Sequence, residues 1–401
     1  MNLKKQHQHI SATDFYNANG YRRLIFTRNF LKKYTFAAMP IYMDIHIVPG
    51  VKAKDVADAH RKDLIHQDEH ACKCMTYWID EERENIFCLI EAPNKDAVIA
   101  MHNKAHGLVP NRIIEVSSNL VESFLGRIYD PENATITDGL KVFQESSYRV
   151  LVVIAHEDEA LLRYRLGNEK ADELLQLQQQ IFRKHLTTYS AREAEHDQAG
   201  FIFSFSSAAK ALEYAHAIQQ ELKEQGPDRI SYRIALHGGE PVQNSIRLFG
   251  DTIQFAYQLC SIAEDQQIAI SSAVRNLAKD HKLNGAQYLS FPAQDESMLR
   301  QIFNILEKCW QDPEFDIDLF TKEMAMSKSQ LYRKAIALTG ESPNTLIRDY
   351  RLVKAKELMK KKGYNIAQVT FDAGFTSPSY FTKCFKQKFG LLPMAYLELL
   401  A

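Results

Sequence analysis

The sequence contains no run of about 18 apolar residues, which is the length that a membrane-spanning helix needs. Its N-terminus also lacks the apolar segment and the small-residue cleavage site of a secretory signal peptide. Cysteine is scarce, with 6 among 401 residues, and only Cys72 and Cys74 lie close together. These absences argue against a membrane protein and against a secreted disulfide scaffold. We therefore expect a cytoplasmic protein without a membrane segment.

The chain as a whole also has almost no net charge, with 49 Lys and Arg against 50 Asp and Glu. This balance hides an asymmetry, because residues 311–401 contain 14 Lys and Arg but only 10 Asp and Glu, a local net charge of +4. A mildly basic C-terminal module on an acidic body is typical of a DNA-binding tail. The length of the chain favours two to four domains.

The C-terminal block shows two pairs of short helices, each pair separated by a turn. In the first pair, Ser327 and Gln330 have the spacing of a capping box at the start of the second helix. In the second pair, Ser377 is placed to cap a helix whose first residue is Pro378. Each of these two capped helices has an apolar face and a polar face. We expect the following residues to contact DNA: Lys328, Ser329, Gln330, Tyr332, Arg333, Ser377, Ser379, Tyr380, Thr382 and Lys383.

A helix from Ser342 to about Lys362 connects the two pairs. Its expected length of about 20 residues corresponds to about 30 Å. Two recognition helices held that far apart can enter successive major grooves, which are about 34 Å apart. Arginine and lysine side chains suit guanine edges and phosphates, whereas serine, threonine and tyrosine suit phosphates or either base.

This block resembles the DNA-binding domain of AraC-type transcription regulators. Residues 326–334 match the first recognition helix of the family, residues 339–352 match its connecting helix, and residues 373–390 match its second unit. The family usually has Thr-Pro after the final glycine, where this chain has Leu392-Pro393. The resemblance implies an all-α double helix-turn-helix domain that binds double-stranded DNA.

The middle block, residues 148–307, opens with a continuous apolar run suited to a buried strand. Alternating helices and strands follow, including a long helix from about Glu169 to Leu186, and predict an α+β domain with a mixed or antiparallel sheet. This block resembles class III nucleotide cyclase domains on residues 165–167, 232–241, 248–252, 262–264 and 267–271.

The cyclase resemblance implies two carboxylates that hold divalent ions. The corresponding positions in this chain are Ala155 and Ala199, although Glu157, Asp158 and Asp197 lie near them. The positions of the family's transition-state Asn and Arg fall on two glutamines, Gln254 and Gln258. We therefore expect no enzyme activity, and a domain that serves as a pocket for a nucleotide or another small ligand, or as a dimerisation scaffold.

The first block, residues 39–117, predicts the strand and helix order β-α-β-β-α-β of the ferredoxin-like fold. On its second helix, His102 and His106 are i,i+4 neighbours on one face, and His46 lies near the end of the first strand. Imidazole ligands suit nickel, copper and zinc. Because the chain has 14 histidines, ordinary surface or packed residues are the alternative interpretation. Cys72 and Cys74 share a strand face but do not form a CxxC pair.

This block also resembles a small family of ferredoxin-like nickel-binding domains, from residues 39–44 through 77–82 and 91–93 to 105–108. The resemblance implies nickel or another divalent transition metal as a ligand. We expect the second helix to pack on the sheet face opposite His46, so that a complete site would need a partner subunit in a homodimer.

Together these patterns predict a multidomain α+β regulator of transcription in five segments. These are a peripheral extension (1–38), a ferredoxin-like metal-binding domain (39–117), a linker (118–147), a degenerate cyclase-like domain (148–307) and a DNA-binding domain (311–401). Its effector is a metal or a small molecule. Two alternatives are a regulator that senses a nucleotide or other ligand through the cyclase-like domain, and a metal-binding scaffold.

Overall fold

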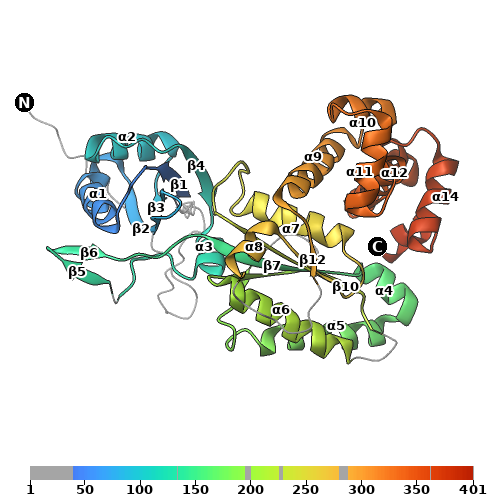
Figure 1. Cartoon of the computed structure of the whole chain (residues 1–401), viewed down its shortest axis with the longest axis horizontal. Helices are drawn as coiled ribbons and strands as arrows, with labels where there is room; N and C mark the ends of the chain where they lie inside the picture. Colours follow the sequence, from blue (N-terminus) through green and yellow to red (C-terminus); the bar gives the residue numbers. More distant parts are fainter. Residues whose placement is uncertain are drawn as a thin grey trace, which may run out of the picture. The chain divides into compact units, whose positions relative to one another are not determined.

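A computed structural model describes residues 39–132, 134–194, 200–224, 229–279, 288–361 and 363–400 (Figure 1). The predicted extension, residues 1–38, lies outside the described residues, as do Asp197 and Ala199. Residues from Pro40 onward belong to one compact unit. Among the described helices, none has both the length and the apolar character needed to cross a bilayer.

Residues 41–116 form a four-stranded antiparallel sheet in the order β2-β3-β1-β4. This confirms the predicted ferredoxin-like arrangement, and Asn94 caps the second helix by accepting a hydrogen bond from Ala97 N. The elements are β1 (Ile41–Ile47), α1 (Ala53–His66), η1 (Gln67–His70), β2 (Lys73–Asp80), β3 (Asn85–Glu91), α2 (Lys95–Ala105) and β4 (Arg112–Val116).

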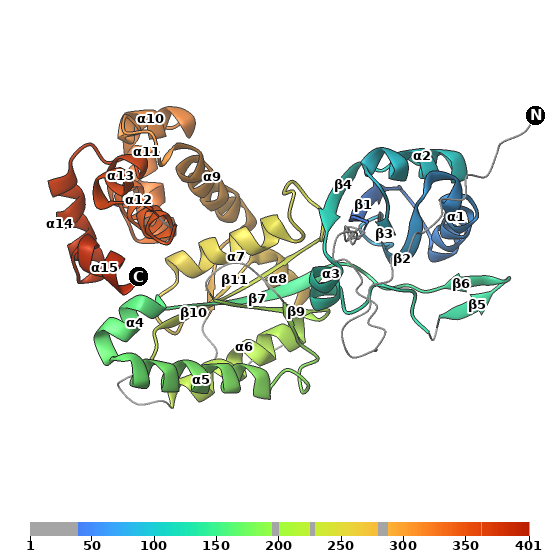
Figure 2. The same ribbon diagram turned by 180° about the vertical axis from the view of Figure 1, so that it is seen from behind.

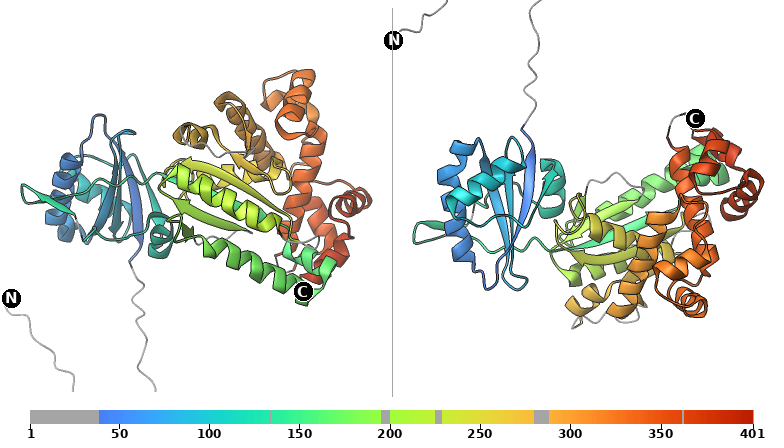
Figure 3. Two further views of the ribbon diagram at one scale, coloured as in Figure 1. Left: turned by 60° about the horizontal axis from the view of Figure 1, so that its bottom comes forward. Right: turned by 90° about the horizontal axis from the view of Figure 1, so that it is seen from above.

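Both faces of this sheet are covered. Helices α1 and α2 lie on one face, and α3 (Ser118–Leu125) lies on the other (Figure 3). The second face buries Met43, Trp78 and Phe87 against Phe124 of α3. Because side chains alternate along a strand, the neighbours of Met43 on β1 point the other way, toward α1 and α2.

The segment predicted as a linker has regular structure of its own. It contains α3 and the hairpin of β5 (Thr135–Thr137) and β6 (Leu140–Val142). Between them, the guanidinium of Arg127 lies 4.4 Å from the ring centroid of Trp78 and donates hydrogen bonds to Tyr77 O (2.6 Å) and to Glu145 (2.7 Å). This segment therefore continues the ferredoxin-like layer, because its apolar side chains cover a sheet face that would otherwise meet water.

The middle domain has a six-stranded mixed sheet in the order β12-β11-β10-β7-β9-β8, which confirms the predicted α+β class. Helices α5 and α6 cover one face, and α7 and α9 cover the other. The elements are β7 (Arg149–His156), α4 (Glu159–Leu166), α5 (Asn168–Lys184), β8 (Arg192–Ala194), β9 (Phe201–Phe205), α6 (Ala208–Lys223), β10 (Tyr232–Gly239), α7 (Gly250–Ile262), β11 (Ile268–Ile270), α8 (Ser272–Leu277), β12 (Tyr288–Ser290) and α9 (Ala293–Cys309).

Three helices of this domain, α4, α8 and α9, have no counterpart among the helices predicted from the sequence. A separate helix, α4, precedes the predicted long helix, and Gly167 separates the two. Gly167 has φ +80°, a conformation that glycine adopts without the steric cost of a side chain. Asp158 caps α4 by accepting from the amides of Ala160 and Leu161.

The C-terminal region is entirely helical, as predicted. Its connecting helix ends at Met359, so it has 17 residues and a length of about 25 Å, shorter than the expected 30 Å. The elements are α10 (Ile317–Glu323), α11 (Lys328–Thr339), α12 (Pro343–Met359), α13 (Ile366–Asp372), α14 (Pro378–Phe389) and α15 (Pro393–Leu399).

The two helix-turn-helix units belong to different cores. The first unit shares a core with α9, through Leu306, Phe320 and Leu331. The second unit has a core of its own around Phe381, Phe385 and Tyr396. The first unit is therefore continuous with the middle domain through α9.

Candidate functional sites

Helix α11 presents a polar face above a buried one. Leu331 and Ala335 are fully buried, while the residues predicted to contact DNA on this helix are exposed. The predicted capping box is present, because Ser327 Oγ accepts from Gln330 N (3.3 Å) and Gln330 Oε1 accepts from Ser327 N (3.0 Å). The Gln330 side chain is thus committed to the cap, which makes it the weakest of the predicted base contacts. Lys328 forms an ion pair with Asp318 of α10.

Helix α14 repeats this arrangement in the second unit. Ser377 caps it and Pro378 occupies its first turn, as predicted. Phe381 and Phe385 are fully buried, and the outward-facing side chains include Tyr380, which is half exposed, and Lys383. The two faces predicted to contact DNA are therefore both exposed in the same structure.

Three predicted metal ligands meet inside the ferredoxin-like domain. The ring centroid of His46 lies 4.8 Å from that of His102 and 6.3 Å from that of His106. His102 Nδ1 lies 3.2 Å from His106 Nε2. All three side chains belong to one chain and to the same face of the sheet. The expectation that α2 lies opposite His46 was wrong, because both helices of this domain pack on the face to which His46 points. A homodimer stays a prediction.

Two buried carboxylates complete the cluster, and the sequence analysis missed both. Asp44 Oδ2 lies 3.0 Å from His102 Nε2, and Asp63 Oδ1 lies 3.2 Å from His102 Nδ1 and 3.1 Å from His106 Nε2. Asp44 is two residues before His46 on β1, and strand periodicity alone would have placed them on one face. Asp63 comes from α1, and no local pattern connects it to the histidines.

Cys88 is the third residue that the sequence analysis missed. It pairs with Asp44 across β1 and β3. Donor atoms of Asp44, His46, Cys88 and His102 all lie within 4.8 Å of one another, and Asp63, His102 and His106 form a second such group. Cys72 and Cys74 belong to neither group.

The electrostatics of this cluster are unusual for buried groups. Burial lowers the pKa of His102, but Asp44 and Asp63 outweigh burial and raise the pKa to about 10. Burial likewise raises the pKa of Asp44, yet His46 and His102 hold it well below its usual range. His46 Nε2 lies 3.4 Å from Asp44 Oδ1 but makes no hydrogen bond among the described residues. Imidazole and carboxylate donors of this kind fit a divalent transition metal in place of the bound proton.

Among the described residues, the cyclase-like positions form no such cluster of metal-ligating side chains. Ala155 is part of β7, paired with Arg233 of β10, and Gln258 is buried on α7. Asp158, which follows Ala155 closely in the sequence, caps a helix. Its carboxylate forms ion pairs with Lys356 and Lys360 of the C-terminal region. Of the two glutamines at the transition-state positions, Gln254 is exposed.

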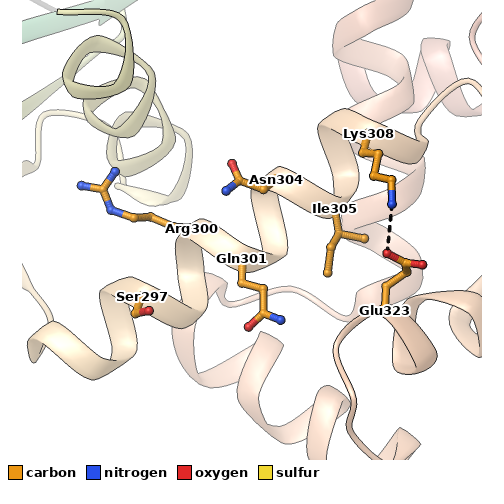
Figure 4. A pocket seen from close by; sticks show the side chains of 7 residues that line it. All are labelled: Ser297, Arg300, Gln301, Asn304, Ile305, Lys308 and Glu323. Atoms are coloured by element: carbon orange, nitrogen blue, oxygen red, sulfur yellow. Dashed lines mark hydrogen bonds and ion pairs between the residues drawn. The ribbon is translucent and has the colours of Figure 1, made fainter. Parts of the chain in front are cut away.

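A groove runs along α9, at the junction of the middle domain and the first helix-turn-helix unit (Figure 4). Ser297, Gln301 and Asn304 line it, and Lys308 pairs with Glu323 across it at 3.4 Å. It lies outside the histidine cluster and the recognition faces.

Two family models match this chain. Residues 42–116 match a model described as nickel responsive protein SCO4226-like. Residues 320–398 match a model described as a helix-turn-helix domain, and the match spans both units described above. The C-terminal region is an AraC-type helix-turn-helix domain.

Each of the curated relatives matches only part of this chain. Histidine kinase P4 of Formosa agariphila is 37% identical over 102 residues, which are 25% of this chain and 7% of that protein. The HTH-type transcriptional activator RhaS of Mannheimia succiniciproducens is 28% identical over 113 residues, 28% of this chain and 40% of that protein. The chain thus spans less than half the length of these relatives.

Two solved structures are each similar to part of this chain. SCO4226 from Streptomyces coelicolor A3(2) is 30% identical, and the match covers 19% of this chain and 94% of that chain, with a TM-score of 0.18. An adenylate/guanylate cyclase/hydrolase from Silicibacter pomeroyi is 23% identical, covering 34% of this chain and 81% of that chain, with a TM-score of 0.29.

Proposed function

We propose that this protein is a sequence-specific DNA-binding transcription regulator whose ferredoxin-like domain senses a divalent transition metal. The observation that carries the proposal is the pair of capped helices, α11 and α14, which present exposed polar faces from one double helix-turn-helix domain. Arg333 and Lys383 are the residues best suited to read guanine edges.

Selection of DNA sequences by the full chain, followed by binding measurements over a salt series, tests this proposal. We expect a selected site to be bound far more tightly than random DNA, with an affinity that falls as salt rises. Arg333→Ala and Lys383→Ala should each weaken specific binding by about 1–3 kcal/mol. Lys223→Ala, an exposed lysine on α6, is the control for loss of one positive charge. A chain that binds no sequence better than random DNA is not such a regulator.

The proposed input is nickel, which the SCO4226-like match favours, or a chemically similar cation. His46, His102 and His106 are the proposed nitrogen ligands. Asp44 and Asp63 are placed to balance the charge of the ion, as they balance the proton that His102 carries without it.

Calorimetry with nickel, zinc and copper on the full chain tests the metal site. The double variant His102→Ala, His106→Ala should lose at least about 100-fold in affinity, because it removes both imidazoles of α2. His216→Ala removes a histidine outside the cluster and should bind as the natural chain does. An unchanged affinity in the double variant would remove this site from the proposal, and metal binding without effect on DNA affinity would remove the sensor role.

For the middle domain we propose a structural role and no cyclase activity. Ala155 and Gln258 leave this domain without a metal ligand and without a cation at the positions that the cyclase resemblance implies. Purified protein should form no cyclic nucleotide from ATP or GTP with magnesium or manganese. Turnover that disappears with substitutions in this domain would overturn this part of the proposal.

A further inference from the structure

Asp158 joins the middle domain to the second helix-turn-helix unit. It lies just beyond the end of β7 and at the N-terminus of α4. Its Oδ2 atom accepts hydrogen bonds from Tyr396 Oη at 3.0 Å and from Lys356 Nζ at 3.2 Å, and Lys360 Nζ lies 3.6 Å away. Lys356 lies in the last turn of α12, Lys360 directly follows that helix, and Tyr396 comes from α15. One carboxylate thus contacts two helices that lie about 200 residues further along the chain.

This contact is buried, which distinguishes it from an ordinary surface ion pair. The side chain of Asp158 is 10% exposed and that of Lys356 is 16% exposed. Burial alone raises the pKa of Asp158, but Lys356 and Lys360 hold it below its usual range, so the carboxylate is charged. A buried charge pair is stable only when its partners are well placed, and Lys356 is further held over the ring of Phe389 at 4.7 Å.

Apolar packing surrounds the charged contact. Ala160 and Leu161, in the first turn of α4, pack against the core of the second unit, which includes Leu358, Phe385 and Tyr396. Figure 2 shows α15 beside α4, and the two helices are in contact. The second unit, which has its own core, is therefore held against the middle domain at this place.

The recognition face of α14 is left open by this contact. Asp158 reaches the inner side of the unit, where α12 and α15 lie, whereas Tyr380 and Lys383 are exposed. Both recognition helices are therefore available while the contact is closed.

We propose that Asp158 is an interdomain latch that fixes the second helix-turn-helix unit for DNA binding. The first unit is already continuous with the middle domain through α9, and the latch ties the second unit to the same body. Fixing the spacing of the two units in advance lowers the ordering cost of binding two grooves at once. The carboxylate that follows β7, close to where a cyclase would hold a metal ion, thus serves the DNA-binding end. This latch rests on the proposed DNA-binding function.

The test uses the full chain with a selected DNA site and three variants. Asp158→Asn keeps an oxygen to cap α4 but removes the charge that Lys356 and Lys360 face. Tyr396→Phe removes one hydroxyl with no change in charge. Glu157→Gln is the control, because it makes the same charge change at the next residue, whose carboxylate pairs with Arg165 at 2.8 Å within the middle domain. DNA affinity and hydrogen exchange of the α4 and α15 amides are the two readouts.

We expect Asp158→Asn to weaken specific DNA binding by about fivefold and Tyr396→Phe by about threefold, with faster exchange in α4 and α15. Simple electrostatics predicts the reverse for Asp158→Asn, because that variant is more positive. Tighter binding in Asp158→Asn but not in Glu157→Gln would mean that the contact restrains DNA binding and would overturn the proposal, and so would unchanged affinity and exchange. If the natural chain binds no specific site, the proposed function fails, and the exchange readout alone then decides whether the latch exists.

Discussion

Two buried histidines in neighbouring domains differ in charge state, because one is protonated and the other is neutral. His102, on α2 of the ferredoxin-like domain, faces Asp44 and Asp63, and its pKa is raised to about 10 against the effect of burial. His237, on β10 of the middle domain, faces Arg300, and burial together with this cation lowers its pKa to about 3. Both rings are almost inaccessible to water. Burial alone favours the neutral form, so the neighbouring charges decide which histidine holds a proton.

This difference separates a ligand site from a structural contact. A divalent cation is attracted to a place where two carboxylates already stabilise a positive charge, and it is repelled from a ring that faces an arginine. The polar cluster of the ferredoxin-like domain is therefore suited to an exchangeable cation. The polar groups around His237 are suited to holding α9 against the sheet of the middle domain.

The strongest test of the comparison removes one carboxylate. Asp44→Ala leaves the cationic His102 with Asp63 as its remaining anionic neighbour, and breaking a buried ion pair in this way costs about 3–5 kcal/mol. The free energy of unfolding of the ferredoxin-like domain should fall by this amount. Hydrogen exchange of the α2 and β1 amides, in the presence of a chelator, measures it. Asp58→Ala, which removes a partly exposed carboxylate on α1 that pairs with Arg61 and Lys62 at the surface, is the matched control and should change it little. An equal loss of stability in the two variants would mean that the buried carboxylate of Asp44 contributes no more than the control carboxylate of Asp58.

The second test adds the cation. Nickel at 100 times its dissociation constant should stabilise the folded protein by about 2.7 kcal/mol, since it binds the folded site only. This gain should disappear in the variant His102→Ala, His106→Ala and persist in His237→Gln. Thermal unfolding with and without nickel measures it. A loss of the nickel effect in His237→Gln alone would place the cation in the middle domain and reverse the comparison.

The third test is acidification. His237 has a folded pKa of about 3, below the ordinary value of 6.5, so the unfolded chain takes up a proton that the folded chain does not. The stability from this residue is therefore fully present above pH 6.5 and is lost as the pH falls toward 3. Between pH 7 and pH 5 the loss amounts to about 2 kcal/mol. His237→Gln keeps an acceptor for Arg300 but cannot titrate, so its stability should fall less over this range in urea unfolding.

The sequence predicted the local parts of this molecule well. The caps at Ser327 and Ser377 are one-turn patterns, and the spacing of His102 and His106 is a helical repeat, so each could be predicted without knowledge of the tertiary fold. The double helix-turn-helix and the ferredoxin-like order could be predicted for the same reason, and the structure confirms both. Which residues read DNA or bind a metal stays a prediction.

The parts that the sequence did not predict depend on contacts between distant segments. Asp63 reaches His102 across 39 residues of chain, and Asp158 reaches Tyr396 across 238. Helix α3 and the first turn of α4 are short. Their apolar residues predict no contact by themselves, because the surfaces that they cover come from other parts of the chain. The face to which His46 points was predicted wrongly because helix placement in this fold is a tertiary property.

The smallest expected effect belongs to Arg300, the partner of the neutral histidine. Arg300→Met removes a hydrogen bond of 2.8 Å to His237 Nε2 and a guanidinium stacked 3.4 Å from the ring centroid of Phe255, but keeps a flexible apolar stem. We expect a loss of about 1–2 kcal/mol in urea unfolding, because no unpaired charge is left behind. The pKa of His237 should rise toward its ordinary value, so the loss of stability between pH 7 and pH 5 should become smaller than in the natural chain. Arg275→Met, which removes an exposed arginine at the neighbouring α8, is the control. If Arg300→Met costs as much as Asp44→Ala, the two histidines do not differ in the way proposed here, and charge pairing stabilises both domains alike.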